Sequence, residues 1–363
     1  MAEMRSAHPY FLYDAIQRQP ALVERQLESL RSAAERAAEA AAGKERIIFV
    51  GIGTSHHAAQ VAERFMRHLT AGRAAALFQQ SFEFAHYPLA LGPQDAVVVI
   101  THTGTTTYSI ECLRAAREAG ALTIAIVGEG SGEGARAADF VVTTCEQEVA
   151  FAYTKSYTTA LAALAILALG VARQRGILAQ DDAAAMLARV PALMRAALAT
   201  EPRVREAAKD VAARQRLVFF GAGPCCATAS EAALKVKETS YIAAEGFETE
   251  EILHGPFSEI DSRTAMVALL AGAAADERAR TILRAAGALG ILRVAVTVPA
   301  AHHDLDAEHT IEIPAVEEWL APFVHLVPLQ LLTYWIALER GINPDTGRQD
   351  QAAHARAHAL YKL

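Results

Sequence analysis

The sequence predicts an α/β protein with two doubly wound, parallel-sheet domains in tandem, an N-terminal helical arm and a C-terminal tail. Apolar runs about as long as one β-strand recur along the 363 residues, and segments long enough for a helix lie between most of them. Runs that are apolar on both faces and alternate with helices are typical of a parallel sheet covered on both sides. The pattern Arg46–Gly53 recurs at Arg216–Gly223, and later pairs match at the same constant offset, which predicts a duplicated unit.

The elements follow this duplication in order. Leucines recur at helical spacing among charged residues in the arm, as far as a break at Gly43. We predict an arm at 1–42, a first domain at 43–175, a helical, alanine-rich linker at 176–205, a second domain at 206–340 and a tail at 341–363. The predicted strands are 46–50, 74–78, 96–100, 122–127 and 140–144 in the first domain, and 216–220, 264–270, 293–297 and 310–313 in the second, before a last helix at 323–339.

The amino-acid composition argues against several classes of protein. The chain carries 34 Lys and Arg against 41 Asp and Glu, a net charge of −7, without long runs of either sign, so no nucleic-acid partner is expected. Four cysteines without a C-x-x-C pair predict neither a disulfide scaffold nor zinc, and they favour a reducing cytoplasm. The N-terminus does not resemble a signal peptide. The uncharged stretch Ser156–Ala172 is short for a membrane span, and we interpret it as a buried helix.

A glycine turn follows the first predicted strand of each copy. Gly51-x-Gly53 resembles the start of a dinucleotide fingerprint, but His56 stands where the third glycine belongs, and the second strand ends in Gln79-Gln80 without a ribose-binding acid. An NAD-dependent oxidoreductase is therefore disfavoured. Thr54-Ser55-His56 places hydroxyls and amides at a helix N-terminus, which suits a phosphate or a sugar hydroxyl, although an ordinary helix cap explains them equally well.

A threonine-rich loop follows the third strand. The residues 101–107 contain five hydroxyls around Gly104 at the start of a helix. Hydroxyl and amide donors at such a position favour an anion. Because the G-x-x-x-x-G-K-[ST] spacing is absent, a phosphomonoester suits the loop better than a nucleoside triphosphate. Threonine capping without a ligand is the alternative.

These motifs, with several later ones, resemble the sugar isomerase (SIS) family, in particular the double-SIS isomerase half of glucosamine-6-phosphate synthase and its relatives without a glutaminase domain. The resemblance covers about 46–330 and implies two flavodoxin-like or Rossmann-like domains. The matching segments are Gly53-Thr54-Ser55-x-His57-Ala58, Thr101-His102-Thr103-Gly104-x-Thr106, Phe151-Ala152-Tyr153-Thr154-Lys155, 233–241, Ala244-Glu245, Leu253-His254-Gly255-Pro256 and 327–332.

The resemblance also implies roles for individual residues. Glu238 would move a proton between C1 and C2, and His254, contributed by the neighbouring subunit, would assist ring opening. The sugar phosphate would be held by Ser55, Thr101, His102, Thr103 and Thr106, with Ala152 and Tyr153 near the sugar. Aldose–ketose interconversion requires a carboxylate base and a second acid/base group, which agrees with this assignment. Glu238 could instead be a solvated helix residue beside Lys235 and Lys237.

The tail departs from the family pattern. The family's Asp-x-Pro-Arg-x-Leu-Ala-Lys ends in a lysine that reaches the sugar, whereas Asp345–Ala352 places alanine there and Lys362 comes ten residues later. Because Ala2 rather than a nucleophilic cysteine follows Met1, glutamine is not expected as a nitrogen source. His302-His303-Asp304 and His354-x-x-x-His358 have ligand-like spacing but lack a third ligand, so no metal is expected.

The sequence therefore predicts a cytoplasmic homodimer that acts without cofactor or metal on a phosphorylated sugar or amino sugar, with no membrane partner. The expected activity is that of an isomerase, or of a related deaminase or deglycase with enediol chemistry. We expect the helix that carries Glu238 to bring it toward the crevice at the strand ends where ligands of such sheets bind. A sugar-phosphate-sensing module without catalysis is the main alternative, although binding alone needs neither Glu238 nor His254.

Overall fold

A computed structural model describes residues 4–178 and 182–361, which contain two five-stranded parallel sheets. The chain divides into two compact units, each with one sheet. The first-sheet unit comprises 21–148, 155–189 and 357–363, and the second-sheet unit comprises 1–20, 149–154 and 190–356. The units interleave along the sequence, and the predicted domain boundaries stay predictions.

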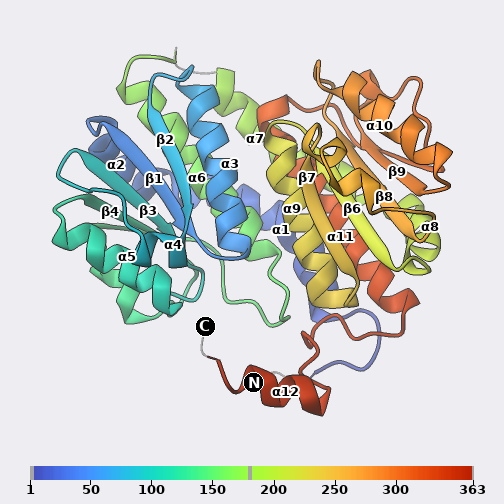
Figure 1. The fold of residues 1–363 in the computed structure, drawn as a ribbon. Helices are drawn as coiled ribbons and strands as arrows, with labels where there is room; N and C mark the ends of the chain where they lie inside the picture. The colour runs from blue at the N-terminus through green and yellow to red at the C-terminus, as the bar shows by residue number, and fades with distance from the viewer. Residues whose placement is uncertain (1–3, 179–181, 362–363) are drawn as a thin grey trace. The chain divides into compact units, whose positions relative to one another are not determined.

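The first sheet has the strand order β2-β1-β3-β4-β5 (Figure 1, blue to teal). This is the order of a flavodoxin-like doubly wound sheet, as the sequence predicts. Its central strands are buried on both faces because helices cover both. The strands are β1 (Arg46–Gly51), β2 (Ala75–Gln80), β3 (Asp95–Ile100), β4 (Leu122–Val127) and β5 (Phe140–Thr143).

Helices form two layers on this sheet. One layer contains α2 (Arg31–Ala42), α3 (Thr54–Leu69) and α6 (Lys155–Gln174), and the other contains α4 (Ser81–His86) and α5 (Thr107–Glu118). Alternate residues of β1, β3 and β4 pack with Cys112, Leu113 and Ala116 of α5 in one buried cluster. The short helix η1 (Glu133–Ala137) joins this second layer.

The second sheet repeats the topology, in the order β7-β6-β8-β9-β10 (Figure 1, yellow to orange). Its strands are β6 (Arg216–Gly221), β7 (Ala243–Glu248), β8 (Thr264–Leu270), β9 (Leu292–Thr297) and β10 (His309–Glu312). The predicted strands omit β7, because Gly246, Glu245 and Glu248 have low strand propensity. As an edge strand, β7 pairs only with β6 and leaves part of its surface exposed.

One face of the second sheet is covered by α8 (Glu201–Ala212), α9 (Pro224–Ser240) and α11 (Ala321–Glu339), and α10 (Asp276–Ala288) packs on β8 and β9. The short helices are η2 (Glu251–Leu253), η3 (Pro256–Ser258), η4 (Pro299–Ala301) and η5 (Glu318–Leu320). The chain also forms α1 (Phe11–Ser29), α7 (Asp182–Leu198) and α12 (Ala352–His358).

Two helical stretches, Lys155–Gln174 and Glu318–Glu339, are long and apolar enough to cross a membrane, and the bent pair of α7 and α8 would make a third if it counted as one span. The apolar windows of both stretches are 100% buried inside the protein. This burial agrees with the interpretation of Ser156–Ala172 as a buried helix.

Candidate functional site

The glycine turns of the two copies have the same backbone geometry. Gly53 adopts φ 57° and ψ −129° before α3, and Gly223 adopts φ 54° and ψ −127° before α9. Glycine reaches such positive φ values without the steric cost that a side chain brings. The duplication read from the sequence therefore extends to the conformation of the loops.

Ser55 and the threonine loop lie at the same edge of the first sheet. β1 and β3 are paired neighbours, and their outgoing connections lead to β2 on one side and β4 on the other. Loops that diverge in this way leave a crevice at the carboxyl ends of the strands, where ligands of open α/β sheets bind. Ser55, which follows β1 and is partly exposed, and Thr101–Thr106, which follow β3, flank this position.

The threonine loop carries hydroxyls that the helix does not use. Thr101 is only 2% exposed, and its Oγ1 is buried without a hydrogen-bond partner among the described residues. The Thr103 hydroxyl accepts hydrogen bonds from the Thr105 amide (3.3 Å) and from the Thr105 hydroxyl (3.0 Å). Thr106 is the N-cap residue of α5, yet its side chain makes no capping hydrogen bond. Capping alone therefore does not explain this threonine.

A glycine-rich segment packs against the threonine loop and holds its backbone. The Gly128 amide donates to the His102 carbonyl (2.8 Å), and the Gly132 amide donates to the Thr103 carbonyl (2.8 Å). Gly104 has a φ of +66°, and a Cβ there would lie 2.9 Å from the Gly132 nitrogen. The loop is thus a close-packed part of the first-sheet unit.

His102 is a neutral side chain at physiological pH. Burial, followed by the positive charge of Lys155, lowers the pKa of His102 to about 4. The Lys155 Nζ is itself paired with Glu146 at 2.8 Å. A neutral imidazole has one N–H donor and one acceptor nitrogen, so it offers hydrogen bonds much as the family's glutamine amide does.

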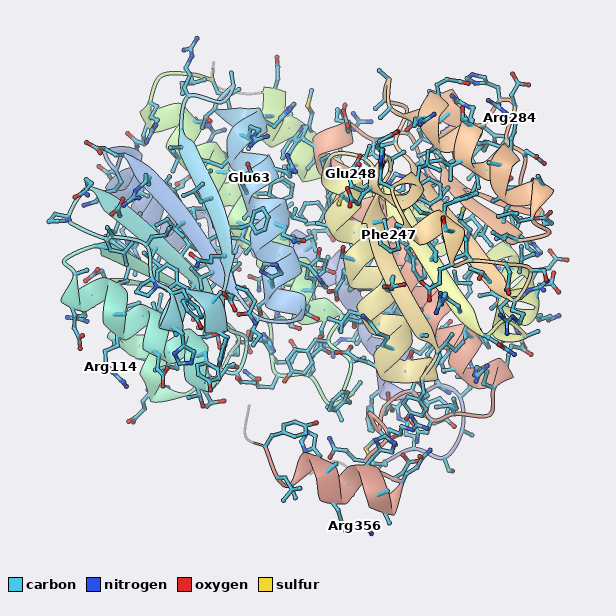
Figure 2. All side chains as sticks on the ribbon, viewed as in Figure 1. Glu63, Arg114, Phe247, Glu248, Arg284 and Arg356 are labelled. Atoms are coloured by element: carbon cyan, nitrogen blue, oxygen red, sulfur yellow. The ribbon has the colours of Figure 1, made fainter. Side chains whose placement is uncertain are left out.

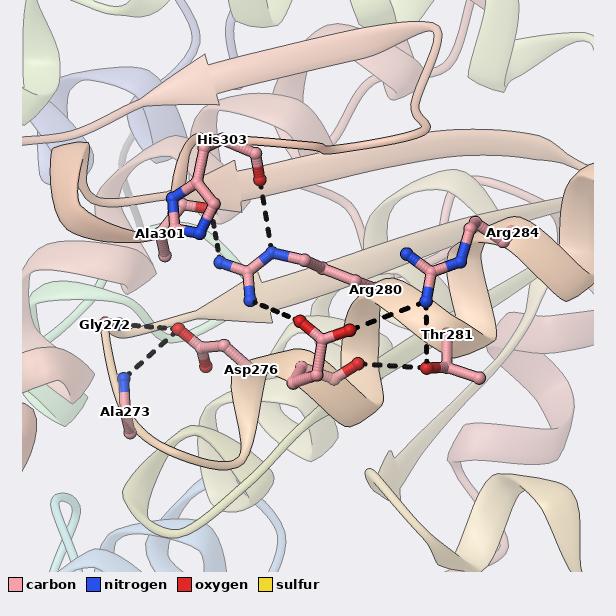
Figure 3. Close-up of polar contacts among 9 residues, drawn as sticks. Gly272, Ala273, Asp276, Arg280, Thr281, Arg284, Ala301 and His303 are labelled. Carbon is pink, nitrogen blue, oxygen red and sulfur yellow. Dashed lines mark hydrogen bonds and ion pairs between the residues drawn. The ribbon is translucent and has the colours of Figure 1, made fainter.

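In the corresponding loop of the second copy, the carboxylate of Asp276 binds to the backbone amides. The register of β3 and β8 on their neighbouring strands aligns Gly272 and Ala273 with Thr103 and Gly104, and Asp276, the first residue of α10, corresponds to Thr107, the first residue of α5. The Asp276 carboxylate accepts hydrogen bonds from the Gly272 amide (2.7 Å) and the Ala273 amide (3.2 Å), as Figure 3 shows. Asp276 is 6% exposed. The backbone of this duplicated loop is therefore suited to an anion.

Arg280, a buried arginine of α10, links the second-copy loop to the segment that follows β9. Arg280 donates to the Ala301 carbonyl (3.1 Å) and the His303 carbonyl (3.2 Å), and it also contacts Glu277 (3.2 Å; Figure 3). These bonds tie α10 to the segment after β9. His303 contributes its backbone carbonyl to this arrangement. Among the described residues, no three or more His, Cys, Asp or Glu side chains are grouped to hold a metal.

Glu238 belongs to an ion-paired cluster on α9. Lys235 Nζ lies 2.6 Å from Glu238 Oε2 and 3.4 Å from Glu231 Oε1. The side chains of Lys235 and Glu231 are 1% and 0% exposed, whereas that of Glu238 is 22% exposed. Burial alone would lower the pKa of Lys235, but the two carboxylates outweigh it and raise that pKa. Glu238 is thus the accessible end of a buried charge network rather than a solvated surface residue.

The position of Glu238 differs from the expectation. Glu238 opens into a pocket of about 360 Å³ whose lining includes Ala243, the first residue of β7. The remaining lining residues are Phe151, Lys237, Tyr241, Ile242, Gly347, Arg348 and His354. The expected position at the carboxyl ends of the second-sheet strands is wrong, because α9 runs back along the sheet and Glu238 lies in its last turn.

His254 follows the other end of β7. Its side chain is 67% exposed, and its Nε2 lies 3.4 Å from Glu250 Oε1. Glu250 is held mainly by Arg278, at 2.6 and 2.8 Å, and Glu248 caps the short helix η2 through the amides of Glu250 and Glu251 (Glu248 is labelled in Figure 2). His254 does not border the Glu238 pocket.

The predicted site residues thus fall in both units. The first-sheet unit holds Ser55, Thr101, His102, Thr103 and Thr106, and the second-sheet unit holds Ala152, Tyr153, Glu238 and His254. Ala152 is buried and Tyr153 is partly exposed. Their roles stay predictions, and Lys362 lies outside the described residues.

The sequence predicts for Lys235 only a charge beside Glu238, and it places neither Arg348 nor His354 at the Glu238 pocket. For Lys235 a signal exists, because spacings of three and four residues from Glu238 and Glu231 favour helical ion pairs.

Comparisons with known proteins agree with these features. The model of the SIS domain family matches residues 42–170 and 211–340. A glutamine–fructose-6-phosphate aminotransferase (isomerizing) from Thermococcus kodakarensis is 30% identical over 355 residues, which cover 96% of this chain and 58% of that protein. The chain thus spans just under three fifths of this relative.

Solved structures share the fold. The C-terminal domain of glucosamine-fructose-6-phosphate aminotransferase from Francisella tularensis superposes with a TM-score of 0.87 at 24% identity, covering 94% of this chain and 99% of that chain. Glucosamine-6-phosphate deaminase from Thermotoga maritima gives a TM-score of 0.74 at 20% identity, covering 93% and 97% of the two chains. With two matched domains, two flavodoxin-like sheets and duplicated loops, this chain belongs to the SIS domain family.

Proposed function

We propose that this protein binds a phosphorylated sugar or amino sugar through residues 101–106 and acts on it by enediol chemistry, without a cofactor. One observation carries the phosphate assignment. In the second copy the Asp276 carboxylate accepts hydrogen bonds from the loop amides, whereas the first copy has Thr107 at that position. The first loop therefore has an anion-binding backbone without an acidic side chain of its own at this place.

The chemistry of the first loop favours phosphate over a carboxylate or a nucleotide. The loop ends at the N-terminus of α5, where the helix dipole and the amides favour negative charge. Its hydroxyls, among them the buried Thr101 Oγ1, add donors suited to several phosphate oxygens. A phosphate group on the sugar would give the protein its main anchor on the substrate.

Glu238 is the proposed base. Its carboxylate would take the proton from the carbon next to the sugar carbonyl and return it to the adjacent carbon. Lys235, 2.6 Å away and fully buried between two carboxylates, stabilises the ionised form that accepts the proton. The similarity to an isomerizing aminotransferase supports this reaction class. A deaminase or deglycase would use the same intermediate and differ in releasing an amine.

We further propose a homodimer in which His254 assists ring opening in the partner's site. The positions of the two residues support this arrangement, because Glu238 lies at the amino end of β7 and His254 follows its carboxyl end.

Deuterium exchange tests the reaction directly. The protein is incubated in heavy water with hexose and hexosamine 6-phosphates, and label at C1 or C2 and released ammonium are measured. We expect exchange in the parent, a loss of about a hundredfold or more in Glu238→Gln, and near-unchanged sugar-phosphate affinity in that variant. Glu339→Gln, an exposed carboxylate at the end of α11, is the matched control and should behave as the parent.

The outcomes separate the alternatives. Exchange that persists in Glu238→Gln would make Glu238 structural. Binding of a sugar phosphate without exchange in the parent would favour a sensing module instead. Ammonium release from a hexosamine phosphate would identify a deaminase.

A further inference from the structure

The segment after α11 is anchored firmly in the second-sheet unit. The Asp345 carboxylate accepts hydrogen bonds from the Phe11 and Leu12 amides, both at 2.8 Å, at the N-terminus of α1. Asp345 is 2% exposed, and its carbonyl accepts a hydrogen bond from the Phe151 amide at 3.0 Å. A carboxylate at a helix N-terminus is a favourable arrangement. Two separate parts of the chain thus fix where this segment begins.

From this anchor the segment reaches the Glu238 pocket. The Tyr241 hydroxyl lies 3.3 Å from the Thr346 hydroxyl, and the Phe151 ring packs on the backbone at Gly347. The Arg348 guanidinium stacks on the Tyr241 ring, 4.8 Å from its centroid. Arg348 then lines the same pocket as Glu238, so a base and a permanent cation border one cavity.

Arg348 is better suited than its basic neighbours to hold developing charge. Its Nε donates to Gln351 Oε1 at 3.1 Å, and among the described residues no protein acceptor contacts its Nη groups. Stacking and the Nε bond orient the guanidinium plane, which leaves a fork of donors for two adjacent oxygens. Lys237 is an exposed, flexible side chain, and Ala352, at the position of the family's lysine, carries no polar group.

We propose that Arg348 binds the two oxygens at C1 and C2 of the sugar and stabilises the enediolate that forms when Glu238 takes the proton. This inference rests on the function proposed above. The C2–H bond breaks, its electron pair forms the C1–C2 double bond, and the carbonyl pair moves onto O1. A proton then passes from O2 to O1, the O2 pair restores a carbonyl at C2, and Glu238 returns its proton to C1. The interconversion is redox-neutral and needs no co-reactant.

Paired ligands test Arg348 independently of turnover. Calorimetry would compare sorbitol and galactitol 6-phosphates, which carry only hydroxyls, with the 5-phospho-arabinono- and lyxonohydroxamates, whose adjacent oxygens copy the enediolate. We expect the parent to prefer a hydroxamate and Arg348→Gln to lose about tenfold or more of that preference, because the affinity for a hydroxamate falls more than the affinity for a hexitol phosphate. Arg348→Lys, which keeps the charge without the fork, should recover only part. Arg356→Gln, an exposed arginine on α12 labelled in Figure 2, is the control and should match the parent.

The results distinguish this inference from the proposed function. If the parent prefers the hydroxamate and Arg348→Gln keeps that preference, the role of Arg348 is rejected while the enediol function stands. If the parent binds the hexitol phosphates and does not prefer a hydroxamate over them, both the enediol chemistry and this inference are rejected. If no probe binds the parent, the hexose phosphate function is rejected and the inference with it.

Discussion

Glu238 and His254 lie at opposite ends of strand β7. Glu238 opens into a pocket bordered by Ala243, the first residue of the strand, and His254 follows the short helix η2 after Glu248, its last residue. At about 3.3 Å per residue, the strand separates these ends by about 17 Å. Within one second-sheet unit the two side chains thus belong to opposite ends of this strand, which supports the proposed sharing of sites between subunits.

Subunit mixing tests this sharing. Glu238→Gln and His254→Ala should each be inactive alone, and an equal mixture after subunit exchange should recover about one quarter of the sites, because half the dimers are mixed and each has one intact site. Activity is measured against a native-gel or mass-spectrometric record of exchange. A mixture shown to contain mixed dimers but no activity would contradict the assignment of His254 to the partner's site.

Thr101→Val tests the role of a buried hydroxyl. Valine keeps the shape of threonine, and Thr101 Oγ1 has no partner among the described residues, so the variant should fold with equal or greater stability. If phosphate uses this hydroxyl, sugar-phosphate affinity should fall by about 1–3 kcal/mol. Thermal melts with and without ligand measure both effects. A variant that binds normally but unfolds more easily would show a structural role instead.

Thr107→Asp transfers the carboxylate of the second copy into the first loop. Asp276 accepts the amides of Gly272 and Ala273, so an aspartate at the corresponding first residue of α5 should accept that of Thr103. We expect a more stable unliganded protein and a loss of sugar-phosphate binding of about a hundredfold or more, since the loop would already hold a negative charge. Thr105→Asp adds the same charge on an exposed side chain two residues earlier and is the control.

If Thr107→Asp and Thr105→Asp weaken binding equally, general charge repulsion rather than occupation of the loop is responsible. Unchanged binding in Thr107→Asp would contradict phosphate binding at this loop.

His102→Gln should remove part of the protein's sensitivity to acid. The pKa of His102 in the folded protein, about 4, lies below the ordinary value of 6.5, because burial disfavours the charged ring. The neutral ring therefore contributes stability that is complete above pH 6.5 and is lost as the pH falls toward 4, about 3 kcal/mol in total.

Glutamine cannot be protonated, so the free energy of unfolding of the variant should decline less between pH 6.5 and 4. Denaturant titrations of both proteins across this window measure the difference, and the other histidines cancel because both proteins contain them. Sugar-phosphate affinity should persist because the amide replaces the neutral ring. Parallel pH profiles would show that His102 is not held neutral by the fold.

Local residue patterns were sufficient to predict the duplicated architecture and the loops. Buried central strands are recognisable as short apolar runs, and the internal repeat aligns the glycine turns, Gly53 with Gly223, whose backbone angles match. These features are readable in the sequence because strand burial and turn geometry depend on neighbours in the chain. The sequence does not predict the edge strand β7, because a strand that is partly exposed at the edge of a sheet does not require a run of apolar residues.

The charged residues acquire their roles only in the folded chain. The sequence contains Asp276, but only the fold shows its carboxylate on the loop amides and its correspondence to Thr107. Likewise, Lys235 is a neighbour of Glu238 in any helix, yet its burial comes from packing around α9. Arg348 reaches the Glu238 pocket because Asp345 caps α1, a helix near the opposite end of the chain. Such contacts join residues far apart in sequence, and no local pattern encodes them.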